Sequence, residues 1–219
     1  MEAAILKQWS DGQHEEAVQA LVDYLKKTPA DIEAYVTLAT FLTTLQDFEQ
    51  AEVLLQKALT KFPDQPALSY ALGTLYYQAE SYQQAEAIFM ELVKNSQSVD
   101  AQYMLAQTYH QMEQNPRALV FALTAQEQQP QELDTNILVG NILISLSDFD
   151  QAQSYLKKAL KINAQNGEAL FKYGLTQLVL DQPSATYFER AKKVAPDYFE
   201  KNKQQLMDIE GFMQAKDHQ

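Results

Sequence analysis

Residues 35–63 read YVTLATFLTTLQDFEQAEVLLQKALTKFP, and this stretch contains two short amphipathic segments. In each segment apolar residues recur at the spacing of one helix face: Leu38, Ala39, Leu42 and Leu45 in the first, and Ala51, Leu55, Ala58 and Leu59 in the second. The segments meet at Gln46-Asp47, and Pro63 ends the second one. The small alanines favour a close approach of two helices. Such a pair cannot bury both of its faces alone, so the stretch predicts a helix pair that needs copies of itself on either side.

The rest of the chain supplies these copies. Aligned on Ala51, the equivalent positions are Ala17, Ala51, Ala85, Ala118, Ala152 and Ser184, at intervals of 32 to 34 residues. A second series follows seven residues later: Tyr24, Ala58, Leu92, Ala125, Ala159 and Ala191. Five residues further on, Pro29, Pro63, Pro130 and Pro196 close four units, and Gln97 and Ala164 close the other two. Because several independent markers keep one register, we interpret the chain as six consecutive helix pairs.

These residues resemble the tetratricopeptide repeat (TPR) family over nearly the whole chain. The family pattern is a small residue after Leu in the first helix, an Ala in the second helix and a closing Pro. It stands here as Leu38-Ala39, Ala51, Ala58 and Pro63. The resemblance, which is to small stand-alone bacterial members, implies an all-α, right-handed superhelical solenoid that forms a single domain over residues 1–219. Its units are residues 1–30, 31–65, 66–98, 99–132, 133–166 and 167–196, followed by a capping helix at 197–216.

Residues at the turns predict how the second helix of each pair begins. Asp47, Ser81 and Asp148 are expected N-caps, and Asn115 followed by Pro116 is expected to play the same role in the fourth unit. In the sixth unit, residues 180–183 join the helices with two residues fewer than elsewhere, so a tighter path is expected there.

Composition narrows the classes of partner. The net charge of −12 argues against nucleic acid, because phosphate binding needs a Lys/Arg footprint. The acidity is uneven: residues 31–132 carry 13 acidic and 4 basic residues, whereas residues 133–196 carry 6 and 7. There is no cysteine, no apolar run of the roughly 18–20 residues that a membrane helix needs, and no export signal in the first residues. We therefore expect a soluble, cytoplasmic protein without membrane insertion.

The resemblance also implies where a partner binds, because in this family the concave face is lined by residues at fixed positions of the first helix. In the second unit these are Val36, Thr40, Thr43 and Thr44, which offer little specificity. The partner-binding residues predicted further along are Tyr70, Thr74, Tyr77, Tyr103, Gln107, His110, Ile137, Asn141, Ile144 and Phe171. Exposed tyrosines provide contact area together with a hydrogen bond, as is typical of an interaction site. The alternative is that a tight coil or the final helix buries such residues, above all Phe171, Leu175, Leu178 and Val179.

Two other functions known in related repeats are not expected. The clamp that binds acidic chaperone tails needs lysines on the early concave positions, and only Asn141 and Lys172 match it. Repeats that read single-stranded RNA have a basic groove, which is missing here.

No catalytic or metal-binding pattern is found either. His14, His110 and His218 have no His or carboxylate at the i+4 spacing expected of a helical metal pair, and there is no Gly-rich phosphate loop. For His110 a hydrogen bond or solvent exposure is the simpler interpretation. We predict no cofactor, no metal and no enzymatic activity.

The sequence thus predicts a non-catalytic scaffold that holds a peptide segment or a helix of a protein partner in its concave groove. One alternative is self-assembly, a homodimer or larger homo-oligomer formed through the C-terminal helix and the apolar end of the groove. Another is an accessory factor of a secretion- or pilus-type assembly, since small bacterial members of the family often serve such machines.

Overall fold

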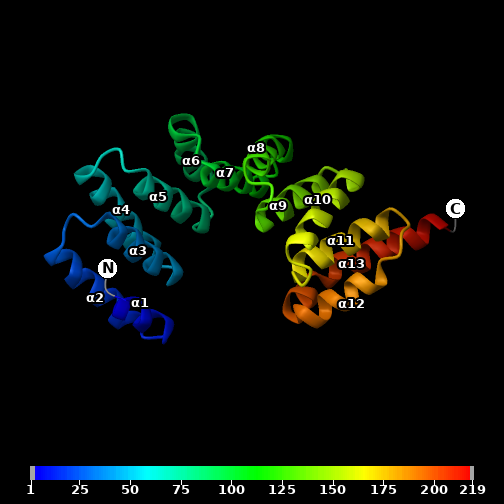
Figure 1. Cartoon of the computed structure of the whole chain (residues 1–219), viewed down its shortest axis with the longest axis horizontal. Coiled ribbons are helices and arrows are strands. Elements are labelled where there is room, and N and C mark those ends of the chain that lie inside the picture. Colours follow the sequence, from blue (N-terminus) through cyan, green and yellow to red (C-terminus); the bar gives the residue numbers. More distant parts are fainter. Residues whose placement is uncertain (1–2, 218–219) are drawn as a thin grey trace. The chain divides into compact units, whose positions relative to one another are not determined.

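The computed structural model describes residues 3–217, without the side chains of Glu210 and residues 212–217, and the described part is entirely α-helical (Figure 1). The helices are α1 (Ala3–Ser10), α2 (His14–Lys27), α3 (Ile32–Thr44), α4 (Phe48–Lys61), α5 (Pro66–Gln78), α6 (Tyr82–Ser96), α7 (Val99–Gln111), α8 (Asn115–Gln128), α9 (Leu133–Ser145), α10 (Phe149–Ile162), α11 (Gly167–Val179), α12 (Ala185–Val194) and α13 (Pro196–Asp217). The predicted all-α repeat architecture is confirmed. His218 lies outside the described residues.

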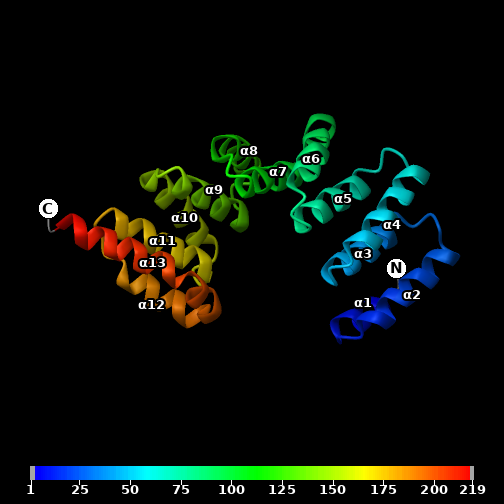
Figure 2. The same ribbon diagram turned by 180° about the vertical axis from the view of Figure 1, so that it is seen from behind.

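Packing divides the chain into two compact units, residues 1–108 and 109–219. In the first unit α3 packs on α4, and α5 packs on both of them and on α6 (Figure 2). In the second unit α11 packs in the same way on α9, α10 and α12. The single domain over residues 1–219 and the handedness of the superhelix stay predictions.

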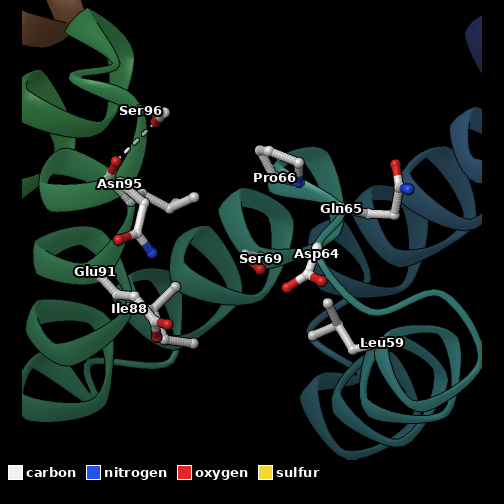
Figure 3. Close-up of a pocket in the computed structure, with 10 residues that line it drawn as sticks. Leu59, Asp64, Gln65, Pro66, Ser69, Ile88, Glu91, Asn95 and Ser96 are labelled. Atoms are coloured by element: carbon white, nitrogen blue, oxygen red, sulfur yellow. Dashed lines mark hydrogen bonds between the residues drawn. The ribbon is translucent and has the colours of Figure 1, made fainter.

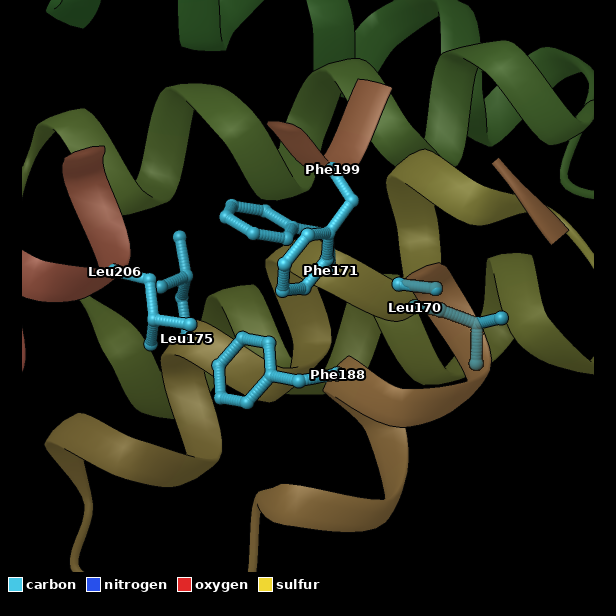
Figure 4. Packing of buried hydrophobic residues seen from close by; sticks show 7 residues of the cluster. Leu170, Phe171, Leu175, Phe188, Phe199 and Leu206 are labelled. Carbon is cyan, nitrogen blue, oxygen red and sulfur yellow. The ribbon is translucent and has the colours of Figure 1, made fainter. Parts of the chain in front are cut away.

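The final helix takes the position of a first helix of a seventh pair. It packs on α11 and α12, as α5 packs on α3 and α4. Its buried residues Phe199 and Leu206 join Phe171, Leu175 and Phe188 in one apolar cluster (Figure 4). The capping role of this helix stays a prediction.

Each turn between the two helices of a pair contains one residue in the left-handed conformation. These residues are Gly12, Gln46, Glu80, Glu113, Ser147 and Asp181, with φ between 55° and 81°. The residue after each of them donates its backbone N–H to the carbonyl five residues back; the N–H of Asp47, for example, lies 2.9 Å from the oxygen of Leu42. This bond belongs to the Schellman motif that ends helices. Only one of the six residues is glycine, so the sequence pattern did not reveal the motif.

The predicted caps are confirmed at two of four positions. The carboxylates of Asp47 and Asp148 accept hydrogen bonds from the N–H groups of Gln50 and Gln151, respectively. Ser81 stands at the cap position without a side-chain cap bond. The prediction for Asn115 is wrong, because the cap residue of α8 is Gln114 and Asn115 is already the first helical residue.

The connection in the sixth pair also differs from its prediction. α11 ends at Val179 and α12 begins at Ala185, so this connection is longer than the one between α3 and α4, and α12 is correspondingly short at 10 residues. Proline disfavours helical geometry in the residue before it and has no N–H. Pro183 therefore delays the start of the helix instead of tightening the path.

The two helices of a pair approach closely where the first one carries glycine. A Cβ added at Gly73 would lie 2.8 Å from Cε1 of Phe89, and one at Gly174 would lie 2.8 Å from Cε1 of Phe188. Phe89 is fully buried, so its ring has no room to withdraw. The ring on the second helix therefore fills the space that a side chain on the first helix would occupy.

Replacing Gly73 with Ala is expected to lower the free energy of unfolding by about 1–2 kcal/mol. Overpacking against Phe89 costs roughly 1–3 kcal/mol, and the better helix propensity of Ala returns up to about 1 kcal/mol. Urea unfolding followed by circular dichroism measures the change. Gly211→Ala is the matched control, because nothing lies within 4 Å of its added Cβ and the change should be neutral or stabilising. Equal stability of the two variants would contradict the close contact.

Candidate protein-binding site

The compact unit of residues 1–108 has an open groove of about 140 Å³ between α3 and α5. Its lining residues are Val36, Ala39, Thr40, Thr43, Tyr70, Ala71, Thr74, Leu75 and Gln78. Tyr70 and Thr74 belong to the predicted partner-binding residues. Val36, Thr40 and Thr43 belong to the concave positions predicted for the second helix pair. The structure therefore brings residues of two successive first helices together on one surface.

Threonines give this groove its chemical character. The hydroxyl groups of Thr40, Thr43 and Thr74 each donate to the backbone carbonyl four residues back in their own helix, over 2.7–3.0 Å. Their protons are thus engaged, and the groove receives methyl groups and hydroxyl lone pairs. No lining residue carries a formal charge. The surface suits uncharged groups, because burying an unpaired charge against it would cost several kcal/mol.

The side chain of Tyr70 packs on Phe89, the same ring that lies against Gly73. Its ring meets the buried ring of Phe89 edge-on, with 5.7 Å between the ring centroids. Burial raises the pKa of the Tyr70 hydroxyl, and the Asp100 carboxylate raises it further. The hydroxyl therefore keeps its proton well above neutral pH and remains available as a hydrogen-bond donor.

The remaining predicted residues of the first unit do not line this groove. Tyr77 packs its ring edge against Tyr82, with centroids 5.7 Å apart. The amide of Gln107 donates to the hydroxyl of Tyr103 over 2.9 Å, and both side chains are half-buried. These residues form local contacts within or next to their own helices.

In the compact unit of residues 109–219, two of the predicted residues have polar partners. Nδ1 of His110 lies 2.7 Å from Oδ1 of Asn115. Since an amide oxygen only accepts, Nδ1 carries the proton. Asn141 donates its amide to Glu168 over 2.8 Å, and its own Oδ1 is buried without a hydrogen-bond partner among the described residues. Ile144 is half-buried.

Two predicted residues are not accessible. Ile137 is 5% exposed and packs with Ala159 and Ala169, while Phe171 is fully buried. The Phe171 ring lies 5.7 Å from the ring of Phe188 and 5.6 Å from that of Phe199 (Figure 4). It also lies 5.9 Å from the ring of Tyr198. For Phe171 the structure shows the alternative, in which the final helix covers the residue, whereas Ile137 is covered by α10 and α11. Both residues were predicted to contact a partner on the expectation that they are exposed, and neither is exposed.

The final helix also creates a polar cluster that the sequence did not predict. Lys172 donates from Nζ to Oε1 of Gln205 over 3.2 Å. Burial lowers the pKa of Lys172, and the nearby Glu168 carboxylate opposes this shift. Burial raises the pKa of Tyr198, and Glu168 raises it further. Lys172 and Asn141, the two residues that match the clamp pattern, are therefore engaged by groups of their own chain.

Among the residues that the structure describes, no group of three or more His, Cys, Asp or Glu side chains could hold a metal ion. In that same part of the chain no helix is both long and apolar enough to cross a lipid bilayer.

Comparisons with known proteins agree with the helix pairs. Family models described as tetratricopeptide repeats match residues 8–56, 42–99 and 133–166, which together make up more than half of the chain. A search of curated proteins found no significant match.

Solved structures share the fold at low sequence identity. PilF of Pseudomonas aeruginosa aligns with a TM-score of 0.76 at 18% identity, over 93% of this chain and 94% of its own. YrrB, described as a TPR protein with an unusual peptide-binding site, aligns with a TM-score of 0.62 at 21% identity, over 82% and 94%. MamA of Desulfovibrio magneticus aligns with a TM-score of 0.63 at 20% identity, over 74% and 92%.

The bond between Asn141 and Glu168 predicts a pH-dependent defect. Asn141→Asp replaces the donor with a second carboxylate next to Glu168, and two adjacent carboxylates cannot both ionise without a penalty. The pKa of the pair then rises in the folded state, so stability is lost as the pH increases through it and recovered below it. We expect a loss of about 1–3 kcal/mol at pH 7. Urea unfolding at pH 7 and pH 4.5, with the unmodified protein as control, measures it; a loss of equal size at both pH values would contradict the contact.

Proposed function

Because the chain belongs to the tetratricopeptide repeat family, whose members are generally non-catalytic interaction modules, we propose that it is a scaffold that binds a protein partner in the groove between α3 and α5. The single observation that carries this proposal is the groove itself, which unites Tyr70 with the threonines of two neighbouring first helices. The ligand is a peptide segment or a helix of the partner. Peptide binding by YrrB, whose fold is similar, is a precedent in the family.

The chemistry of the groove selects the kind of segment. Methyl groups of Val36, Thr40 and Thr74 favour apolar contacts, and the hydroxyl of Tyr70 and the amide of Gln78 provide hydrogen-bond donors for backbone carbonyls. Tyrosine is a frequent anchor of such interfaces because it gives a large contact area at low entropic cost. We therefore expect an uncharged segment with apolar or small polar side chains.

The alternatives receive less support. Self-assembly through the apolar end of the predicted groove would need Phe171 and Leu175, and both are buried in the cluster with α13. A role in a secretion- or pilus-type assembly stays a hypothesis, because the likeness to PilF at 18% identity concerns the fold. A cytoplasmic location is likewise part of the proposal.

A bulky charge in the groove is expected to weaken peptide binding. Peptides are selected from a random library on the immobilised full-length protein, and their affinities for variants are measured by fluorescence anisotropy. Thr40→Arg should weaken binding at least about tenfold, because it removes a threonine that lines the groove and obstructs the site; a tenfold change corresponds to about 1.4 kcal/mol.

Thr60→Arg is the matched control. Thr60 is also exposed and also donates its hydroxyl to the carbonyl four residues back, but it does not line the groove. The control should bind like the unmodified protein. If both arginine variants bind equally well, or if no peptide is selected, the groove is not the binding site.

A further inference from the structure

A second cavity lies at the junction of the second and third helix pairs (Figure 3). It has a volume of about 420 Å³ and shares no lining residue with the groove between α3 and α5. Its walls are formed by Leu59, Asp64, Gln65, Pro66, Ser69, Ile88, Glu91, Leu92, Asn95 and Ser96. In Figure 3, Glu91, Asn95 and Ser96 on α6 stand on one side, and Asp64 on the connection between α4 and α5 stands on the other.

At two other junctions a cation of the chain itself bridges the same place. Nζ of Lys61 in α4 donates to the carbonyl of Pro29 over 2.8 Å. Nη2 of Arg190 in α12 donates to the carbonyl of Ala164 over 2.6 Å. In the repeat register Pro29 and Ala164 are the closing residues of the first and fifth pairs. In both cases a basic side chain of one pair thus reaches back to the end of the preceding pair.

A further junction uses an amide for this purpose. Between the fourth and fifth pairs, the closing residue is Pro130, and its carbonyl accepts a hydrogen bond from Nδ2 of Asn136 over 3.0 Å. Satisfying the closing carbonyl is therefore a recurrent feature of the junctions.

The junction at the cavity lacks such a group. The register places Glu91 where Arg190 stands and Asn95 where Lys61 stands, and Pro63 is the closing residue. Among the described residues, no hydrogen bond reaches the Pro63 carbonyl and no ion pair engages Asp64 or Glu91. The repeat positions that hold a cation elsewhere are here Asn95 and Glu91, and both line the open cavity together with Asp64.

The electrostatics of the cavity favour a cation. The two carboxylates face it, and the last turn of α6 contributes its carbonyl end, which carries about half a negative charge. The first turn of α5, at Gln65 and Pro66, contributes a partial positive charge of similar size, which does not offset two full negative charges. Residues 1–108 as a whole carry 15 acidic and 6 basic residues, so the wider field has the same sign.

We propose that this cavity binds the side chain of an arginine or lysine of a protein partner. The cationic group takes the place that Lys61 and Arg190 occupy at other junctions and donates hydrogen bonds to Asp64 and Glu91. Its aliphatic part packs on Leu59, Ile88 and Leu92, as long basic side chains commonly do on apolar surfaces. The site is separate from the groove, so either can fail without the other.

The test uses a blocked amino acid as the probe. N-acetyl-arginine amide is titrated into the ¹⁵N-labelled full-length protein, and N-acetyl-citrulline amide, which has the same shape without the charge, serves as the paired ligand. Saturable shifts of the amides of Ser69, Glu91 and Asn95 are expected with arginine. Citrulline should bind at least about tenfold more weakly, because it forfeits a charge-assisted hydrogen bond worth roughly 1.5–3 kcal/mol. Equal binding of the two ligands would overturn the proposal.

Two variants check the site from opposite directions. Glu91→Gln removes one carboxylate and should weaken arginine binding about tenfold, whereas Glu127→Gln, an exposed glutamate in the last turn of α8, should have no effect. Asn95→Lys places the chain's own cation where Lys61 stands and should also abolish probe binding while preserving the fold. If neither Glu91→Gln nor Asn95→Lys changes the affinity, the cavity is not a cation site.

Discussion

The contact between a small residue on the first helix and a large side chain on the second is the constraint on which the other features depend. At Gly73 the ring of Phe89 fills the space of the missing side chain, and this fixes both the distance and the rotation of the two helices. Once that face of α5 is fixed inward, Tyr70 and Thr74 are directed toward α3. The same ring then supports Tyr70 edge-on. The groove is thus a consequence of the internal packing of each pair and of its neighbour.

Much of the fold could be predicted because the repeat register records which residues must be small or apolar. The helix pairs and the acidic caps at Asp47 and Asp148 follow from that register. The left-handed turn residues could not be predicted, since backbone hydrogen bonds impose this conformation on Gln46 and Glu80 as well as on Gly12. Asn115 was misplaced by one position because Gln114, which makes no side-chain cap bond, stands at the cap position of α8.

The candidate site was predictable only in part, because position within a repeat determines direction but not exposure. Tyr70 and Phe171 occupy the same position in their units, yet one lines a groove and the other is covered by α13. What differs is the neighbour: α5 faces the polar threonines of α3, whereas α11 meets the aromatic side chains of the last helix. Likewise, Glu91 stands at the repeat position that Arg190 occupies in the sixth pair. This difference became informative only when the hydrogen bonds of the other junctions were known.

The packing of each helix only on its near neighbours also governs how the chain folds. Within the described residues, the packed helices are one or two places apart in the helix order. The loops that must close during folding are therefore short, because native contacts form between segments that lie close together along the chain. Such a topology is associated with fast folding. Nucleation can begin in any well-packed pair and propagate in both directions, as in other linear arrays. Unfolding, conversely, can start at either end while the interior pairs persist, so local damage stays local.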